Sequence, residues 1–311
     1  MVLTDLFVLP ALVGVYLCFR FRRQRVAVDL LPLPTILLAA FAGYWLWYAH
    51  RPQPSTLDRE LAPSIRYFRE SRLVPRPMVL HRVEIDLTTP GLEFVVTPPE
   101  PTGGFDLPAR TTSQFVREFD VQVAINASYF YPFRAESPID YYPHRGQPVN
   151  TTGLCVSNGR WYSSPEPGYT MFAIGVDNRA VVGPDKFFVW NGASGQPVLL
   201  KEGQIVESLD AGELNPRTAV GIDRTGTRML WLVIDGRQPR YGEGVTFREL
   251  AALLQEFGAS DALALDGGGS STLVARINGE VRVLNCPIHG RHPPGVERPV
   301  ANCLGVRVLR R

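Results

Sequence analysis

The segment between residues 229 and 267 constrains the fold of this chain more than any other. Six apolar residues, Met229–Ile234, predict a buried strand. The tetrapeptide Thr246-Phe-Arg-Glu249 is a capping box, and apolar residues follow it at helical spacing as far as Gly258, so a helix is predicted next. Ala262–Leu265 predicts a second short buried strand. A strand–helix–strand unit of this kind normally joins parallel strands, which indicates a sheet of the α/β or α+β classes.

Both strands of this unit end in the same way, with an aspartate followed by a glycine. These aspartates are Asp235 and Asp266. If the strands are parallel, both carboxylates lie at the sheet edge where open α/β folds build their sites. Two carboxylates facing one cleft can divide acid and base roles, as they do in glycosidases. The alternative is that each aspartate only begins a turn. The shared placement favours a catalytic pair.

The second aspartate opens a loop of small residues, DGGGSST, which runs from Asp266 to Thr272. Three consecutive glycines allow positive φ angles and a close approach of other groups. Successive N–H groups in such a loop can form an anion-binding concavity, and the hydroxyl groups of Ser270 and Ser271 add donors. The loop therefore predicts a site for a phosphorylated or sugar substrate, with a tight turn as the alternative.

Composition limits the class of protein. The chain has 311 residues, 20% of them charged, and a net charge of +2, so no bulk electrostatic attraction to nucleic acid is expected. With 28 glycines and 27 prolines, the body should be rich in turns and strands. We therefore predict a mixed, twisted sheet with few flanking helices. Cysteines stand at 18, 155, 286 and 303 without CxxC spacing, which argues against zinc. A Cys286–Cys303 bridge and three free thiols both remain open.

Two apolar runs at the N-terminus, residues 2–19 and 30–48, are each about as long as a membrane-spanning helix (~20 residues). Four arginines lie between them, at positions 20, 22, 23 and 25. The positive-inside rule places this cluster in the cytoplasm and everything after residue 50 outside it. We therefore predict a transmembrane hairpin (1–50), a tether (51–77) with one short helix at Leu61–Glu70, and an extracytoplasmic domain (78–311). The predicted location is the cell membrane.

Several other positions in the domain are candidates for a site. Asn126 ends an apolar strand, 121–125, and is either a turn residue or a donor in the site. Arg217 and Arg298 are candidates for clamping a phosphate. His289 and His292 stand in a proline-rich loop and are expected at the surface rather than as ligands. A further helix is predicted at residues 112–119, with Thr112 or Ser113 as its cap.

Five segments together resemble the phosphodiester glycosidase family. They are VAINASYF (123–130), NPRTAVGIDRTG (215–226), VIDGRQ (233–238), GVTFRELAALLQEFGASDALALDGGGSSTLV (244–274) and RPVANCLGVRV (298–308). Their order and spacing match the family over residues 80–311. Each segment alone is weak evidence for the family, whereas the five segments together are specific to it. One departure is Asn126-Ala-Ser, where the family usually has Asn-Gly-Gly.

The resemblance implies hydrolysis of a glycosidic bond whose leaving group is a phosphate. It assigns Asp266 and Asp235 as the catalytic carboxylates, with the choice of acid and base and the stereochemical outcome left open. The residues implied for substrate or phosphate binding are Asn126, Arg217, Thr218, Arg237, Gly267, Gly268, Gly269, Ser270 and Ser271. No cofactor is expected. Two aspartates, an asparagine and a phosphate are also a donor set that suits Ca²⁺ or Mg²⁺, but a site without metal is favoured.

Two other functions compete with this hypothesis. A non-catalytic envelope protein would bind a phosphoglycan without cleaving it, although both aspartates are present. A metal-dependent phosphodiesterase would need a histidine-rich ligand set, and the histidines after residue 50 (81, 144, 289 and 292) show no metal-ligand spacing. The expected partners are the membrane and a phosphorylated glycan of the cell envelope, such as a teichoic acid or a phosphorylated exopolysaccharide.

Overall fold

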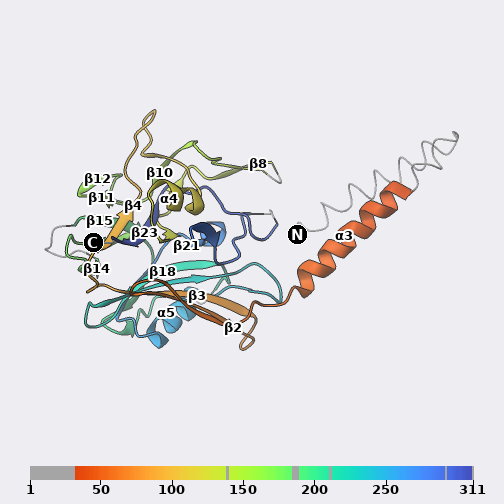
Figure 1. Ribbon diagram of the computed structural model, residues 1–311. Coiled ribbons are helices and arrows are strands. Elements are labelled where there is room, and N and C mark those ends of the chain that lie inside the picture. Colours follow the sequence, from red (N-terminus) through yellow and green to blue (C-terminus); the bar gives the residue numbers. More distant parts are fainter. Residues whose placement is uncertain (1–31, 138–139, 184–188, 210–211, 291–292, 310–311) are drawn as a thin grey trace. The chain divides into compact units, whose positions relative to one another are not determined.

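The computed structural model describes residues 32–137, 140–183, 189–209, 212–290 and 293–309 (Figure 1). The chain divides into two compact units, Met1–Arg51 and Pro52–Arg311. In the first unit the described residues form one helix, α3 (Pro32–His50). The described part of the second unit contains the sheets and two further α-helices.

Helix α3 coincides with the second predicted membrane segment, 30–48. Among the residues that the structure describes, however, no helix is both long enough and apolar enough to cross a membrane. The two prolines that begin α3 and the tyrosines and tryptophans near its end lower its mean hydropathy. The first predicted segment, 2–19, lies outside the described residues. The predicted transmembrane hairpin is therefore not supported by the described helix.

The largest sheet has eight strands in the order β1-β2-β3-β19-β18-β20-β16-β17. Their bounds are β1 (Leu57–Ala62), β2 (Ile65–Arg72), β3 (Met78–Asp86), β19 (Arg228–Ile234), β18 (Arg217–Ile222), β20 (Asp261–Ala264), β16 (Val198–Lys201) and β17 (Gln204–Ile205). The predicted tether with a helix at Leu61–Glu70 is wrong here, because β1 and β2 form an antiparallel hairpin that extends this sheet. Ile65 and Tyr67 of β2 are buried, with exposed Arg66 between them, so pairing with β3 overrides any local helical preference.

A five-stranded sheet faces this one, with the order β22-β21-β6-β23-β4. Its strands are β22 (Glu280–Val283), β21 (Leu273–Ile277), β6 (Val123–Asn126), β23 (Cys303–Val308) and β4 (Leu92–Val96). A second five-stranded sheet has the order β12-β11-β15-β13-β14, with β12 (Arg160–Tyr162), β11 (Cys155–Ser157), β15 (Asn191–Gly195), β13 (Thr170–Ile174) and β14 (Ala180–Val182). Smaller sheets are formed by β5 (Leu107–Pro108), β10 (Pro148–Thr151) and β7 (Phe130–Tyr131), and by β8 (Arg134–Ser137) with β9 (Asp140–Tyr142).

Strand β19 shows how the layers pack. Successive side chains of a strand point to opposite faces of its sheet. Met229, Trp231 and Val233 lie in the core between the eight-stranded sheet and its neighbours. The alternate residues, Leu230, Leu232 and Ile234, pack with the apolar side of α5 (Phe247–Glu256). Both faces of β19 are thus buried, which explains its unbroken apolar sequence.

The two helices of the second unit cover opposite outer faces of the paired sheets (Figure 1). Helix α5 begins at the predicted capping box, in which Thr246 and Glu249 cap each other's backbone N–H groups. Helix α4 (Thr112–Glu118) packs Phe115 and Val116 against the five-stranded sheet of β6. Its cap is Thr111, which precedes the two predicted caps, Thr112 and Ser113. The predicted strand-rich body with few helices is confirmed.

The strand–helix–strand unit that the sequence predicted is present, with one difference. Strands β19 and β20 both run antiparallel to β18, which lies between them. They therefore point in the same direction, as expected, but are not neighbours. Among the described strands every ladder is antiparallel. The ends of β19 and β20 and the start of β18 consequently meet at one edge.

Candidate active site

The register of the strand pairs brings the predicted site residues to the sheet edge at which β19 and β20 end and β18 begins. Arg217, the first residue of β18, pairs with Ile234 at the end of β19, and Ala219 pairs with Ala264 at the end of β20. From the facing sheet, β6 ends at Asn126. Asp266 and the glycine loop follow directly after β20. Most of the predicted residues are therefore gathered in one region, although they come from segments far apart in the sequence.

Both sheets hold the backbone of the glycine loop. The N–H of Asp266 donates to the carbonyl of Ala127 (2.9 Å), and the N–H of Gly268 donates to that of Pro216 (2.8 Å). The N–H groups of Ser270 and Ser271 donate to the carbonyls of Gly267 and Gly268 (3.2 and 3.3 Å), in a short 3₁₀ turn (η1, Gly268–Ser270). These four loop N–H groups are thus used within the protein. The predicted anion cradle of loop N–H groups is correspondingly smaller than expected.

Asp266 is half-buried, and burial raises its pKa to about 6. Hydrogen bonds from the Ser270 hydroxyl and the Gly267 N–H, and the positive charges of Arg298 and Arg237, act in the opposite direction but do not cancel the effect of burial. A carboxyl with a pKa close to neutrality exchanges protons readily at physiological pH. Asp266 therefore has the properties of a general acid or base.

Arg298 is the cation most deeply buried beside Asp266, with 9% of its surface exposed. Its Nε donates to Nδ1 of His289 (3.0 Å), and its Nη1 donates to Oγ of Ser270 (3.3 Å). The guanidinium also lies over the ring of Phe133, 4.1 Å from the centroid. Burial lowers the pKa of Arg298 to about 10, so it stays charged at neutral pH. A Cβ at Gly269 would lie 2.2 Å from its Nη2, which is why this position needs glycine.

His289 was expected at the surface, and this expectation is wrong. The residue is 6% exposed and accepts the hydrogen bond from Arg298. His292, which was predicted to lie at the surface together with His289, lies outside the described residues. The sequence contains no local signal for the buried contact, because Arg298 stands nine positions further along in an irregular loop.

The other two arginines differ in their surroundings. Arg237 is exposed, its guanidinium lies against Gly268, and its Nε donates to Oδ1 of Asn215 (2.9 Å). Arg217 donates to the backbone carbonyls of Val245 and Glu213 (3.2 and 3.1 Å) and lies over the ring of Phe247. Arg237 and Arg298 are thus the cations that contact the glycine loop with their guanidinium groups.

Asn126 is completely buried and joins three parts of the site. Its Nδ2 donates to the backbone carbonyl of Asp266 (2.6 Å). Its Oδ1 accepts from the Thr218 hydroxyl (2.8 Å) and from the N–H of Thr272 (3.1 Å). Asn126 and Thr218, both predicted to bind substrate or phosphate, therefore bind the loop's own backbone and each other in this structure.

Asp235 is also buried, at 1% exposure, and all its contacts are inside the protein. Its Oδ1 accepts from Asn285 Nδ2 (3.2 Å) and from the N–H of Cys286 (2.8 Å). Its Oδ2 lies 3.1 Å from Nε2 of His81, whose Nδ1 lies 2.8 Å from the hydroxyl of Tyr67. Asn285 also donates to the carbonyl of Ser271 (3.0 Å), which ties Asp235 to the glycine loop. Asp235 is thus linked through Asn285 to the backbone of the glycine loop.

Two tyrosines lie near Asp266. Tyr129 and Tyr169 make an edge-to-face contact with ring centroids 5.6 Å apart. Burial raises the pKa of each hydroxyl, and the charge of Asp266 adds to the effect, so both stay protonated at neutral pH. Sequence reasoning assigned no role to these tyrosines, although Tyr129 lies in the VAINASYF segment. It also missed Tyr169, His81 and Asn285 as site residues, because they stand outside the five segments that carry the resemblance.

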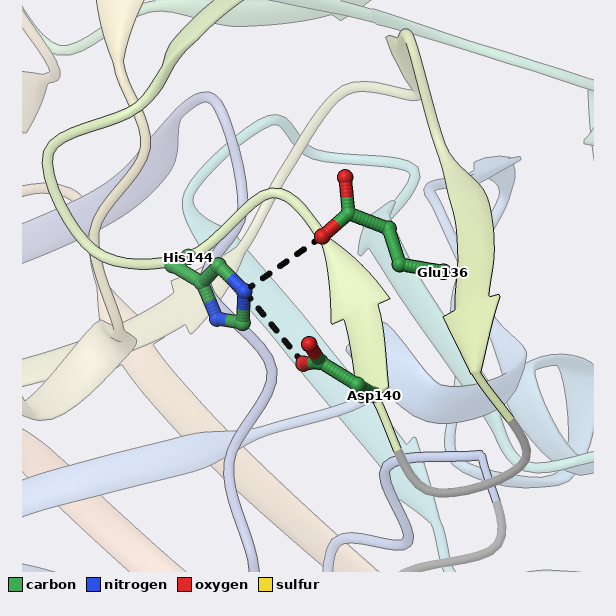
Figure 2. A group of neighbouring side chains, drawn as sticks. All are labelled: Glu136, Asp140 and His144. Carbon is green, nitrogen blue, oxygen red and sulfur yellow. Dashed lines mark ion pairs between the residues drawn. The ribbon is translucent and has the colours of Figure 1, made fainter.

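One group of side chains has the composition of a metal site. Figure 2 shows Glu136 and Asp140 pointing toward the ring of His144. One ligand atom of each lies within 4.8 Å of the others, and His144 Nε2 is 3.8 Å from Glu136 and 3.3 Å from Asp140. Of the residues that the structure describes, no other trio of histidine, cysteine or carboxylate side chains meets this spacing, so Asp266 and Asp235 belong to none. Cys155, Cys286 and Cys303 form no disulfide bond, which excludes the Cys286–Cys303 bridge.

Comparison with known proteins decides the family. The model of the phosphodiester glycosidase family matches residues 119–307, which is more than half of the chain. The chain belongs to the phosphodiester glycosidase family. No curated protein matched the sequence.

Solved structures share the fold at low identity. A zebrafish N-acetylglucosamine-1-phosphodiester alpha-N-acetylglucosaminidase catalytic domain, auto-inhibited by its pro-peptide, is 20% identical, with a TM-score of 0.59 over 83% of this chain and 85% of that one. A hypothetical protein from Synechocystis is 16% identical (TM-score 0.56), and the match covers 82% of this chain and 64% of that protein. A putative exported protein from Burkholderia pseudomallei is 16% identical, with a TM-score of 0.51 over 74% of each chain.

Membership of the phosphodiester glycosidase family gives the observed site a chemical context. The matched region contains Asn126, the glycine loop with Asp266, and Arg298. It excludes His81, which is contributed by β3. One of the side-chain contacts that hold Asp235 in place, the one from His81, therefore comes from a segment outside the family match.

Proposed function

We propose that this protein hydrolyses the glycosidic bond of a sugar-1-phosphodiester. Water adds to the anomeric carbon, the bond from that carbon to the phosphate oxygen breaks, and the products are a free sugar and a phosphomonoester. The observation that carries the proposal is the half-buried Asp266 carboxyl, whose pKa is about 6, beside Arg298 and Arg237. This arrangement supplies a proton-exchanging group and two cations for the leaving phosphate.

Asp266 acts in its ionised form and accepts the proton of the attacking water. A phosphomonoester is a good leaving group, so the departing oxygen needs cationic stabilisation more than it needs a proton. One base is then sufficient, which agrees with the buried position of Asp235. Asp235 acts as a positioning residue that holds Asn285 and the glycine loop in place.

The reaction proceeds without a metal ion at Asp266. The candidate ligands Glu136, Asp140 and His144 form a separate group, to which Asp266 does not belong. Chelation with EDTA should therefore leave the rate unchanged. Loss of activity in EDTA, restored by a divalent cation, would refute this part of the proposal.

The substrate is a phosphoglycan of the cell envelope, or its precursor, and the domain lies outside the cytoplasm. This part of the proposal is supported by the sequence alone, from the arginine cluster between the two N-terminal apolar runs. Fusion of a reporter that is active only outside the cytoplasm to the C-terminus tests it. An inactive fusion, with the matching cytoplasmic reporter active, would refute it.

Isotope labelling tests the chemistry. The full chain is incubated with a sugar-1-phosphodiester in H₂¹⁸O, and the label is located in the products. We expect ¹⁸O in the free sugar, and Asp266→Asn should abolish the reaction. Asp261→Asn, at the first residue of the strand that precedes Asp266, is the matched control and should retain activity. Label in the phosphate, with sugar phosphate as product, would mean cleavage of the P–O bond and would refute the proposal.

A further inference from the structure

A cavity of about 380 Å³ opens next to the candidate active site. Its walls are formed by β9 and the loop after it and by two residues near the C-terminus: Asp140, Tyr141, Pro143, His144, Arg145, His289 and Pro299. Pockets that bind small molecules have volumes of roughly 300–1,000 Å³. The cavity is therefore large enough for one small ligand group. The reaction proposed above assigns no part of the substrate to it.

A continuous series of contacts connects this cavity to Asp266. His289 lines the cavity and accepts a hydrogen bond from Nε of Arg298 (3.0 Å). On its other side, Nη1 of Arg298 donates to the Ser270 hydroxyl (3.3 Å), which in turn hydrogen-bonds the Asp266 carboxylate. Arg298 thus lies between the carboxyl that acts on the sugar and the cavity. A phosphate held by Arg298 would have its reacting sugar on one side and its second ester group on the other.

The walls of the cavity suit a ring that carries hydroxyl groups. Tyr141 is stacked parallel to Phe133, with 5.9 Å between ring centroids, and packs on His289 at 5.1 Å. Gly290 has no room for a side chain, because a Cβ there would lie 2.5 Å from the Tyr141 ring. The aromatic wall is therefore held in place by its neighbours. Flat aromatic surfaces combined with a few polar groups are typical of ligand pockets.

Polar groups at the mouth of the cavity supply both donors and acceptors. Arg145 and His144 line it and are exposed, and Asp140 lies beside them. As Figure 2 shows, His144 is flanked by Asp140 and Glu136, which orient its ring. Hydroxyl groups can pair with carboxylate, imidazole and guanidinium groups alike. This mixture favours a sugar or another polyol over a purely anionic or purely apolar ligand.

We propose that this cavity binds the sugar esterified to the leaving phosphate, and so selects the phosphoglycan on its leaving side. The proposal rests on the proposed function, because it assumes that a phosphodiester lies between Asp266 and Arg298. The cavity residues do not touch the reacting atoms. They contribute binding of the leaving group and determine which phosphodiesters are preferred.

Two substrates that differ only in the second ester group test this assignment. Both carry the same sugar-1-phosphate; in one it is esterified to methanol, in the other to the primary hydroxyl of a hexose. The full chain should have the higher kcat/KM for the hexosyl ester. Arg145→Ala and His144→Ala should each lower kcat/KM for the hexosyl ester by about fivefold, the worth of one lost hydrogen bond. Neither variant should change kcat/KM for the methyl ester.

Lys201→Ala removes an exposed cation from the eight-stranded sheet and serves as the matched control; it should leave both rates unchanged. Equal losses on both esters in the cavity variants, or no loss on either, would overturn the assignment while leaving the proposed function in place. Equal kcat/KM of the unaltered chain for the two esters would also overturn it. If the unaltered chain hydrolyses neither ester, the proposed function fails and the assignment fails with it.

Discussion

Replacing Asp266 with asparagine is expected to make the protein more stable at neutral pH while abolishing hydrolysis. The Asp266 carboxyl has a pKa of about 6 in the folded protein, because burial disfavours its charged form more than Ser270, Arg298 and Arg237 favour it. Asparagine has nearly the same shape and is never charged. The variant therefore removes an unfavourable buried charge and keeps the packing of the loop.

The magnitude follows from the pKa. An aspartate in an unfolded chain titrates near 3.9, and each pKa unit corresponds to 1.36 kcal/mol, so ionised Asp266 costs about 3 kcal/mol of folding stability. The folded state holds the Asp266 proton to higher pH than the unfolded state does. Below about pH 4 the carboxyl is neutral in both states and costs no folding stability; the cost develops, and stability is lost, as the pH rises to about 6. The gain in Asp266→Asn should therefore be about 3 kcal/mol at pH 7.5, about half of that at pH 5, and absent below pH 4.

Urea denaturation of the full-length protein and the variant at these pH values measures the difference directly. A midpoint that rises in the variant at pH 7.5, and converges with the unaltered protein as the pH falls, supports the reasoning. A variant that is equally stable or less stable at pH 7.5 would refute it, because burial would then not dominate the environment of Asp266. A gain of equal size at every pH would also refute it, since titration would not be the cause.

Two further changes test other parts of the site. Ser270→Ala removes a hydrogen bond to ionised Asp266, so the pKa of Asp266 should rise above 6. As the solution is acidified, kcat/KM of the variant should therefore begin to fall at a higher pH than that of the unaltered protein. An unchanged pH–rate profile would contradict the contact between Ser270 and Asp266. Asn126→Ala leaves the N–H of Thr272 and the carbonyl of Asp266 without their buried partner. The free energy of unfolding, measured by urea denaturation, should therefore fall by about 3 kcal/mol. A loss below about 1 kcal/mol would show that water replaces the amide.

The local pattern of the sequence predicted several elements closely. The capping box at Thr246 and Glu249 begins α5 as expected. The apolar runs before Asp235 and Asp266 are buried strands. These predictions succeed because capping and apolar periodicity depend on residues within a few positions of one another.

Predictions that depended on distant partners were less reliable. Residues 57–72 were expected to be a tether with a helix and instead form a hairpin, since β2 pairs with β3 as well as with β1 and so joins the large sheet. His289 was expected to be exposed and is buried against Arg298. The environment of Asp235 likewise depends on His81 and Asn285, which are 154 and 50 positions away from it. No local pattern records such contacts.

By itself, the sequence determined which residues are gathered at the site. Two strands that run the same way must bring the residues after them, Asp235 and Asp266, to the same edge of a sheet. Only the tertiary structure decided how those residues differ. Asp266 remains half-buried beside Arg298, with a pKa near neutrality, whereas Asp235 is enclosed by His81, Asn285 and a backbone N–H. The two aspartates are equivalent in the sequence, and their surroundings, which set charge and access, are formed by segments that meet only when the chain folds.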